Sequence, residues 1–155
     1  MIRRATPADI PALVEFRALM MTEMGEDFDA DPTLRTDVSA WFERRMLRQD
    51  AFAAFVADLP DAGVVACAMG TVEDHAPSPR SRTGLRGELA NVVTLPEFRR
   101  RGLARGCVEA LLDWFARETP VATVRLAATA DGVDLYRSLG FTEPRDVILQ
   151  YRVPR

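Results

Sequence analysis

The sequence has few residues of the kinds that form disulfides or metal sites. Its 155 residues include two cysteines, Cys67 and Cys107, and one histidine, His75. The cysteines lie far apart on apolar segments, so we expect reduced core thiols rather than a disulfide or a metal pair. No cysteine or carboxylate lies at metal-ligand spacing from His75, so no metal site is predicted. A contact between His75 and a substrate stays open.

Long apolar runs and an excess of positive charge are also missing. No apolar run approaches the roughly 18 residues of a membrane span, and no signal-peptide core follows Met1. We therefore expect a cytoplasmic protein with no membrane partner. The formal net charge of −3 does not favour nucleic-acid binding. Hydrophobic residues make up 48% of a chain long enough to bury one core, so residues 1–155 are predicted to form a single domain.

The clearest local pattern runs from Gly87 to Glu118. Residues 87–95 are mostly apolar and β-branched, which is typical of a buried strand, and Pro96 cannot continue a ladder of hydrogen bonds. A basic turn follows, and after it apolar residues recur at helical spacing. The pattern therefore predicts a strand that leads through a turn into the N-terminus of a long amphipathic helix.

The turn has the chemistry of a phosphate site. The first amides of a helix have no acceptor inside it, and the helix dipole places about half a positive charge there. Arg99, Arg100 and Arg101 add fixed positive charge, while Gly102 and Ala104 leave the backbone accessible. The turn matches neither Gly-x-x-x-x-Gly-Lys-Ser/Thr nor Gly-x-Gly-x-x-Gly. An arginine-rich helix start without a ligand is the alternative.

The rest of the chain predicts shorter strands and helices around this unit. Residues 2–5 are predicted to be a strand, and Thr6 and Pro7 start a helix that ends near Gly25. The composition of residues 73–86 is typical of a loop. The other predicted elements are a helix over about 32–47, a hairpin of strands 52–57 and 64–72, a strand over 124–128, a short helix capped by Asp131 and stopped by Gly140, and a strand over 147–153.

Several charged residues have two interpretations. Arg17 falls on the apolar stripe of the first helix, where it can snorkel to solvent or contact a substrate. The acidic loop from Glu23 to Asp31 can attract a cationic amine or only be solvated. Strict alternation along the central strand predicts one face with Glu88, Ala90, Val92 and Thr94 and another with Leu89, Asn91, Val93 and Leu95.

Two motifs give the chain its resemblance to a known family. The turn Arg99-Arg-Arg-Gly102-Leu-Ala104 resembles the Arg/Gln-x-x-Gly-x-Gly/Ala signature of the GCN5-related N-acetyltransferases, and it has that family's setting between a strand and a four-turn helix. The stretch Leu135-Tyr136-Arg-Ser-Leu-Gly140-Phe141 resembles the second family motif. The resemblance implies an α/β fold with one mixed central sheet, in the order β-α-α-β-β-β-α-β-α-β, and helices on both faces.

The resemblance also implies a binding site for acetyl-coenzyme A (acetyl-CoA). In the family the turn amides hold the pyrophosphate, which here implies Arg99, Arg100, Arg101, Gly102, Leu103 and Ala104. The acyl group and pantetheine are bound by the strand before the turn, which here implies Val92, Val93 and Thr94. Thr129 stands where the family often has an asparagine that contacts pantetheine, and it can still form one hydrogen bond in each direction.

Two catalytic residues are implied in the same way. Glu88 lies where the histone-modifying members have a glutamate general base, with edge exposure or an internal salt bridge as the alternative. Tyr136 is implied to protonate the departing coenzyme A thiolate, with core packing as the alternative. Both roles suit attack of an amine on a thioester, because the amine must lose a proton and the sulfur must gain one.

The sequence therefore predicts an acyl-CoA-dependent N-acyltransferase. We expect it to transfer acetyl from acetyl-CoA, without a metal, to a primary amine of a small molecule or peptide by direct attack in a ternary complex. A homodimer is compatible with the sequence. A regulatory module that binds acyl-CoA without transfer is the alternative. RNA binding is disfavoured because aromatic platforms and a basic charge balance are missing.

Overall fold

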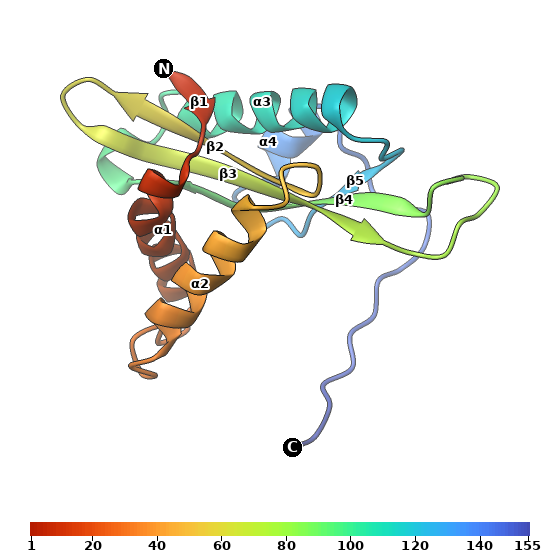
Figure 1. Ribbon diagram of the computed structural model, residues 1–155, viewed down its shortest axis with the longest axis horizontal. Coiled ribbons are helices and arrows are strands. Elements are labelled where there is room, and N and C mark those ends of the chain that lie inside the picture. The colour runs from red at the N-terminus through yellow and green to blue at the C-terminus, as the bar shows by residue number, and fades with distance from the viewer.

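The computed structural model describes residues 1–155 and has a five-stranded sheet at its centre (Figure 1). The strands lie in the order β1-β2-β3-β4-β5, and all neighbours are antiparallel except β4 and β5, which are parallel. Their bounds are β1 Ile2–Arg4, β2 Phe52–Leu59, β3 Gly63–Asp74, β4 Leu85–Thr94 and β5 Val124–Arg125. The predicted hairpin and mixed sheet are confirmed.

Helices cover both faces of this sheet (Figure 1). The first two pack on one face, and the long third helix lies across the other with the short fourth helix beside it. None of them combines the length and apolar character that crossing a membrane requires. Their bounds are α1 Ile10–Glu23, α2 Leu34–Met46, α3 Leu103–Glu118 and α4 Val133–Ser138, with 3-10 turns at Pro7–Asp9 and Pro96–Phe98.

The hydrophobic core has two halves, one on each face of the sheet. Phe16 of α1 and Phe42 of α2 are buried against the first face. On the second face, α3 buries Leu111 and Phe115. The ring of Phe115 lies so close to the sheet that a Cβ atom on Gly70 would come within 2.6 Å of it. The lack of a side chain at Gly70 therefore lets α3 pack closely against the sheet.

A bulge interrupts β4 at Asn91. Cys67 pairs with Val93 and Met69 with Ala90, so two residues of β4 oppose one residue of β3. Asn91 has a φ of 47°, in the left-handed region. The predicted alternation is wrong from this point on, because Leu89 packs in the α3-side core while Val93 packs in the core under α1 and α2. An inserted residue shifts every later side chain to the other face.

Three predictions for the C-terminal part are corrected. Strand β5 is two residues long rather than five. Helix α4 has Gly132 rather than Asp131 at its N-cap, with no side-chain cap. Residues 147–153 do not form a strand, because no backbone group of residues 142–155 pairs with another backbone group. The segment runs away from the body of the molecule (Figure 1) and leaves its apolar side chains exposed.

Candidate functional site

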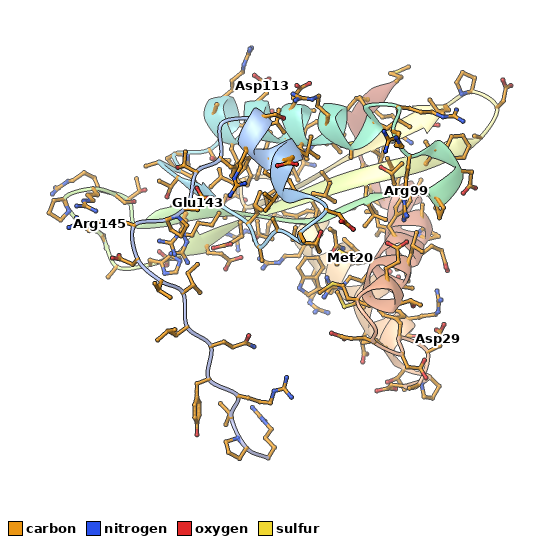
Figure 2. The ribbon with its side chains drawn as sticks, turned by 180° about the vertical axis from the view of Figure 1, so that it is seen from behind. Met20, Asp29, Arg99, Asp113, Glu143 and Arg145 are labelled. Atoms are coloured by element: carbon orange, nitrogen blue, oxygen red, sulfur yellow. The ribbon has the colours of Figure 1, made fainter.

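The sheet opens between β4 and β5. The two strands pair only at Gly87 with Val124 and at Glu88 with Arg125. From Leu89 onward the edge of β4 has no strand beside it, and this edge borders a cavity of about 640 Å³. We call it the α3 cavity because the first turn of α3 forms one wall. Met20 of α1 and Arg99 of the preceding turn, both labelled in Figure 2, also line it.

The start of α3 presents free amides to this cavity. Leu103, Ala104 and Arg105 line it, and their N–H groups have no backbone acceptor. Gly102 has a φ of 75°, which favours glycine, and a side chain added there would meet no atom within 4 Å. Arg100 has a φ of 60°. Consecutive N–H groups in such a turn form a concave site for an anion, so the predicted phosphate site has suitable geometry.

The three arginines of the turn have different surroundings. Arg99 donates from Nε to the carbonyl oxygen of Thr94 at 3.1 Å and pairs with Glu23 of α1. Arg101 lies over the ring of Phe98, 5.1 Å from its centroid, and is not part of the cavity wall. Arg100 lines the cavity and forms no hydrogen bond or ion pair within the protein. Of the three arginines, Arg100 is therefore the one that lines the α3 cavity and has no hydrogen-bond or ion-pair partner in the protein.

Tyr136 lies on the opposite wall of the α3 cavity. Its ring packs edge-on against Phe141, with centroids 5.8 Å apart. Burial raises the pKa of the phenol above its ordinary value, so the hydroxyl carries its proton at neutral pH. Thr129 lines the same cavity and accepts the backbone N–H groups of Gly132 and Val133 on its carbonyl oxygen. All the predicted cofactor-binding residues except Arg101 border this one cavity, as does Tyr136.

A second cavity of about 590 Å³ lies between α1, α2 and the sheet. We call it the α2 cavity. Glu88 and Asn91 of β4 line it, together with Arg17 of α1 and Trp41 of α2. Glu88 also forms an ion pair with Arg86 at 3.1 Å, and its side chain is 35% exposed. The two interpretations of Glu88, as salt-bridge partner and as site residue, are therefore compatible.

The two cavities border adjacent residues at the bulge of β4. Asn91 lines the α2 cavity, and its neighbour Val92 lines the α3 cavity. Sequence patterns singled out Glu88 and Tyr136 but did not predict the bulge, because alternation alone cannot reveal an inserted residue. The arrangement places a carboxylate, Glu88, on one side of β4 and a protonated phenol, Tyr136, on the other.

Other candidate residues lie elsewhere. His75 is exposed and lines neither cavity. In the acidic loop, Asp29 pairs with Arg35, and no residue from Glu26 to Asp31 lines the α2 cavity. Cys67 and Cys107 are free and buried, as expected. No group of three or more histidine, cysteine, aspartate or glutamate side chains is placed to hold a metal ion.

Comparison with protein families identifies the chain. Residues 14–141 match the model of the acetyltransferase (GNAT) family. This chain belongs to the GNAT family of acetyltransferases. As a GNAT acetyltransferase it is an enzyme of acyl transfer. The match contains both cavities' residues on β4 and the whole of the turn before α3.

Solved structures share the fold at low sequence identity. A predicted acetyltransferase from Clostridium acetobutylicum, solved with acetyl-CoA, is 21% identical with a TM-score of 0.84, covering 97% of this chain and 95% of that one. A GCN5-related N-acetyltransferase from Ralstonia eutropha is 20% identical with a TM-score of 0.81 and covers 97% of each chain. Glucosamine-6-phosphate N-acetyltransferase from Arabidopsis thaliana is 17% identical with a TM-score of 0.75, again covering 97% of each. Among curated proteins, none matches the chain.

Proposed function

We propose that residues 1–155 form one N-acetyltransferase domain that transfers acetyl from acetyl-CoA to a primary amine of a small molecule or peptide. The observation that carries this proposal is that two cavities border adjacent residues, Asn91 and Val92, at the bulge of β4. The α3 cavity suits a pyrophosphate at the free amides of α3, and the α2 cavity suits an amine beside Glu88. A thioester extended along the open edge of β4 would then meet the amine at Asn91 and Val92.

The proposed reaction removes two protons from the amine nitrogen and adds one to the sulfur. Glu88, directly or through water, takes a proton from the ammonium group, and the neutral nitrogen attacks the thioester carbonyl. Backbone N–H groups on the open edge of β4, among residues 92–94, hold the carbonyl oxygen as it gains charge. The C–N bond forms, the C–S bond breaks, and Tyr136 gives its proton to the departing sulfur. The nitrogen loses its second proton, directly or through water, to the phenolate of Tyr136, which leaves a neutral amide and restores the phenol. The raised pKa of Tyr136 keeps that proton available at neutral pH.

Direct attack in a ternary complex is favoured over an acetyl-enzyme. The thiols of Cys67 and Cys107 are 1% and 0% exposed, and burial raises the pKa of both, that of Cys107 to about 12. A buried, protonated thiol is a poor nucleophile. The sequence contains no lysine, so no side chain of the protein offers an amine that could accept the acetyl group.

A thiol-release assay tests this proposal. Purified protein is given acetyl-CoA with each member of a panel of primary amines, and both free coenzyme A and the acetylated amine are measured. We expect release that depends on the amine and matches acetylated product one to one. Release that is the same with and without every amine would contradict the proposal. The lack of lysine keeps the background from self-acetylation low.

A further inference from the structure

The α2 cavity is lined by as many arginines as carboxylates, but not all of them form ion pairs. Arg45 pairs with Glu73 at 3.6 Å, and Glu88 pairs with Arg86. The lining residues Arg17, Arg44 and Asp37 take part in no ion pair. Arg44 and Asp37 are exposed, whereas Arg17 is half-buried. Arg17 is therefore the cation of this cavity that is partly removed from water without a counter-ion.

Arg17 is held in place by a single hydrogen bond. Its Nη1 donates to Oδ1 of Asn91 at 2.8 Å, across 74 positions of sequence. The other N–H groups of the guanidinium have no acceptor in the protein. A guanidinium stays charged at any physiological pH, and its planar fork of donors matches the oxygens of a carboxylate or phosphate. A half-buried arginine with free donors thus has the properties of an oxyanion receptor.

Asn91 provides a second and independent observation. The residue is only 4% exposed, yet its side-chain NH₂ group donates no hydrogen bond. Its Oδ1 is already used by Arg17, and its backbone carbonyl accepts the Sγ–H of Cys67 at 3.2 Å. The Nδ2 atom is not one of the fully buried side-chain atoms that lack a partner, so it is accessible from the α2 cavity that Asn91 lines. A ligand in this cavity can therefore accept a hydrogen bond from the amide.

We propose that the amine acceptor carries an oxyanion group, which Arg17 and Asn91 bind. The inference rests on the proposed function and narrows its substrate class. Arg17 has only donors and a fixed positive charge, and Asn91 adds its free NH₂ group, so the pair attracts acceptor oxygens with negative charge. Glu88, on the same strand and the same cavity, is left for the amine end. A cavity of about 590 Å³ suits a small amino acid or an amine phosphate.

Matched pairs of amines test this inference. Glycine is compared with glycinamide, β-alanine with β-alaninamide, and phosphoethanolamine with ethanolamine, by kcat/KM in the thiol-release assay. We expect the charged member of at least one pair to be preferred about tenfold to hundredfold, the range of a charge-assisted hydrogen bond. Preference for β-alanine or glycine identifies a carboxylate, and preference for phosphoethanolamine identifies a phosphate.

Two variants assign the preference to the proposed residues. Arg17→Met keeps the length of the side chain but removes its charge, so the preference should fall to about twofold or less, mainly through a higher KM. Asn91→Asp gives Arg17 an internal counter-ion and removes two donors, and it should have the same effect. Arg17→Lys should keep part of the preference. For each pair of amines, the ratio of the two kcat/KM values in the variant is compared with the same ratio in wild type. Differences in pKa between the two amines therefore cancel.

Arg48→Met is the matched control. Arg48 is exposed, pairs with Asp50 and lines neither cavity, so the preference should be unchanged. Equal use of charged and neutral amines, unaltered in Arg17→Met, would overturn the inference and leave the proposed function standing.

If acetyl-CoA binds but no amine is acetylated, the proposed function is wrong. The inference is then tested by calorimetry of the charged amines with protein saturated with coenzyme A. Binding to wild type that is lost in Arg17→Met supports the inference, and no binding to wild type overturns it.

Discussion

Nε of Arg86 lies 3.1 Å from Oε1 of Glu88, two positions along β4, at the last point where β4 and β5 pair. The ion pair holds the carboxylate at the wall of the α2 cavity, immediately before the sheet opens. A base in this position can reach an amine in the α2 cavity while the thioester lies on the open edge of β4.

Glu88→Gln should remove the proposed base without disturbing the fold. The rate should fall by about a hundred- to ten-thousandfold, with the largest loss at low pH, where few acceptor molecules are already neutral. The measurement is kcat/KM against pH for wild type and variant. Arg86→Gln, which leaves the carboxylate in place, should lose much less. A small loss that does not change with pH would show that Glu88 has only a structural role.

Tyr136→Phe should separate packing from proton transfer. The ring still contacts Phe141, so the free energy of unfolding should change by about 1 kcal/mol or less. The rate should fall much further, and it should fall less with a thioester whose leaving thiol has a low pKa, since that thiolate departs without a proton. Rates with both donors are compared in both proteins. Equal losses would argue against the acid role, and full activity would refute it.

Gly102→Glu should abolish binding of acetyl-CoA by placing negative charge at the free amides of α3. In wild type, a hundredfold excess of ligand over its Kd should stabilise the protein by about 2.7 kcal/mol, seen as a rise in melting temperature. Gly63→Glu is the matched control, because Gly63 has a similar φ of 69°, open space around it and a position outside the cavity. An unchanged rise in Gly102→Glu would remove the phosphate assignment.

The acid stability of the protein should depend on Asp9. Hydrogen bonds from Arg3 hold the pKa of Asp9 at about 2, below its ordinary value of 3.8. A folded pKa below the unfolded one means that the stabilisation is complete above about pH 4 and is lost as the pH falls towards about 2. Asp9→Asn should therefore lose about 2 kcal/mol at neutral pH and little at the acid end.

Urea unfolding of wild type and Asp9→Asn over this pH range measures the difference. Asp61→Asn serves as the control, because Asp61 is exposed in the turn between β2 and β3 and forms no ion pair. Its curve should run parallel to that of wild type. If Asp9→Asn loses stability with acid as steeply as wild type, the ion pair of Asp9 with Arg3 does not contribute as described.

Local sequence patterns were sufficient to predict the strand, turn and helix between Gly87 and Glu118. Helix α3 begins at Leu103 and ends at Glu118 because one stripe of its surface is apolar and its start follows a glycine in the left-handed region. These causes lie within neighbouring residues, so the sequence displays them. The turn before α3 was predictable for the same reason.

Features that depend on distant partners were not predictable in this way. The bulge at Asn91 exists only in relation to its pairing with β3, and it reverses the faces of Val92 and Val93. A strand over residues 147–153 requires an edge to pair with, which an apolar run cannot supply by itself. The apolar stripe of α1 was sufficient to predict that Arg17 points toward the core or a cleft. Its hydrogen-bond partner Asn91 was not predictable, because it lies 74 residues away in the sequence.

Two-substrate initial-rate kinetics test the central claim most directly. Rates of coenzyme A release are measured over a grid of acetyl-CoA and amine concentrations, and the protein incubated with acetyl-CoA alone is weighed by intact mass spectrometry. A ternary complex assembled across the bulge of β4 predicts intersecting double-reciprocal lines and a protein of unchanged mass. Parallel lines together with a stable gain of one acetyl group on the protein would contradict it.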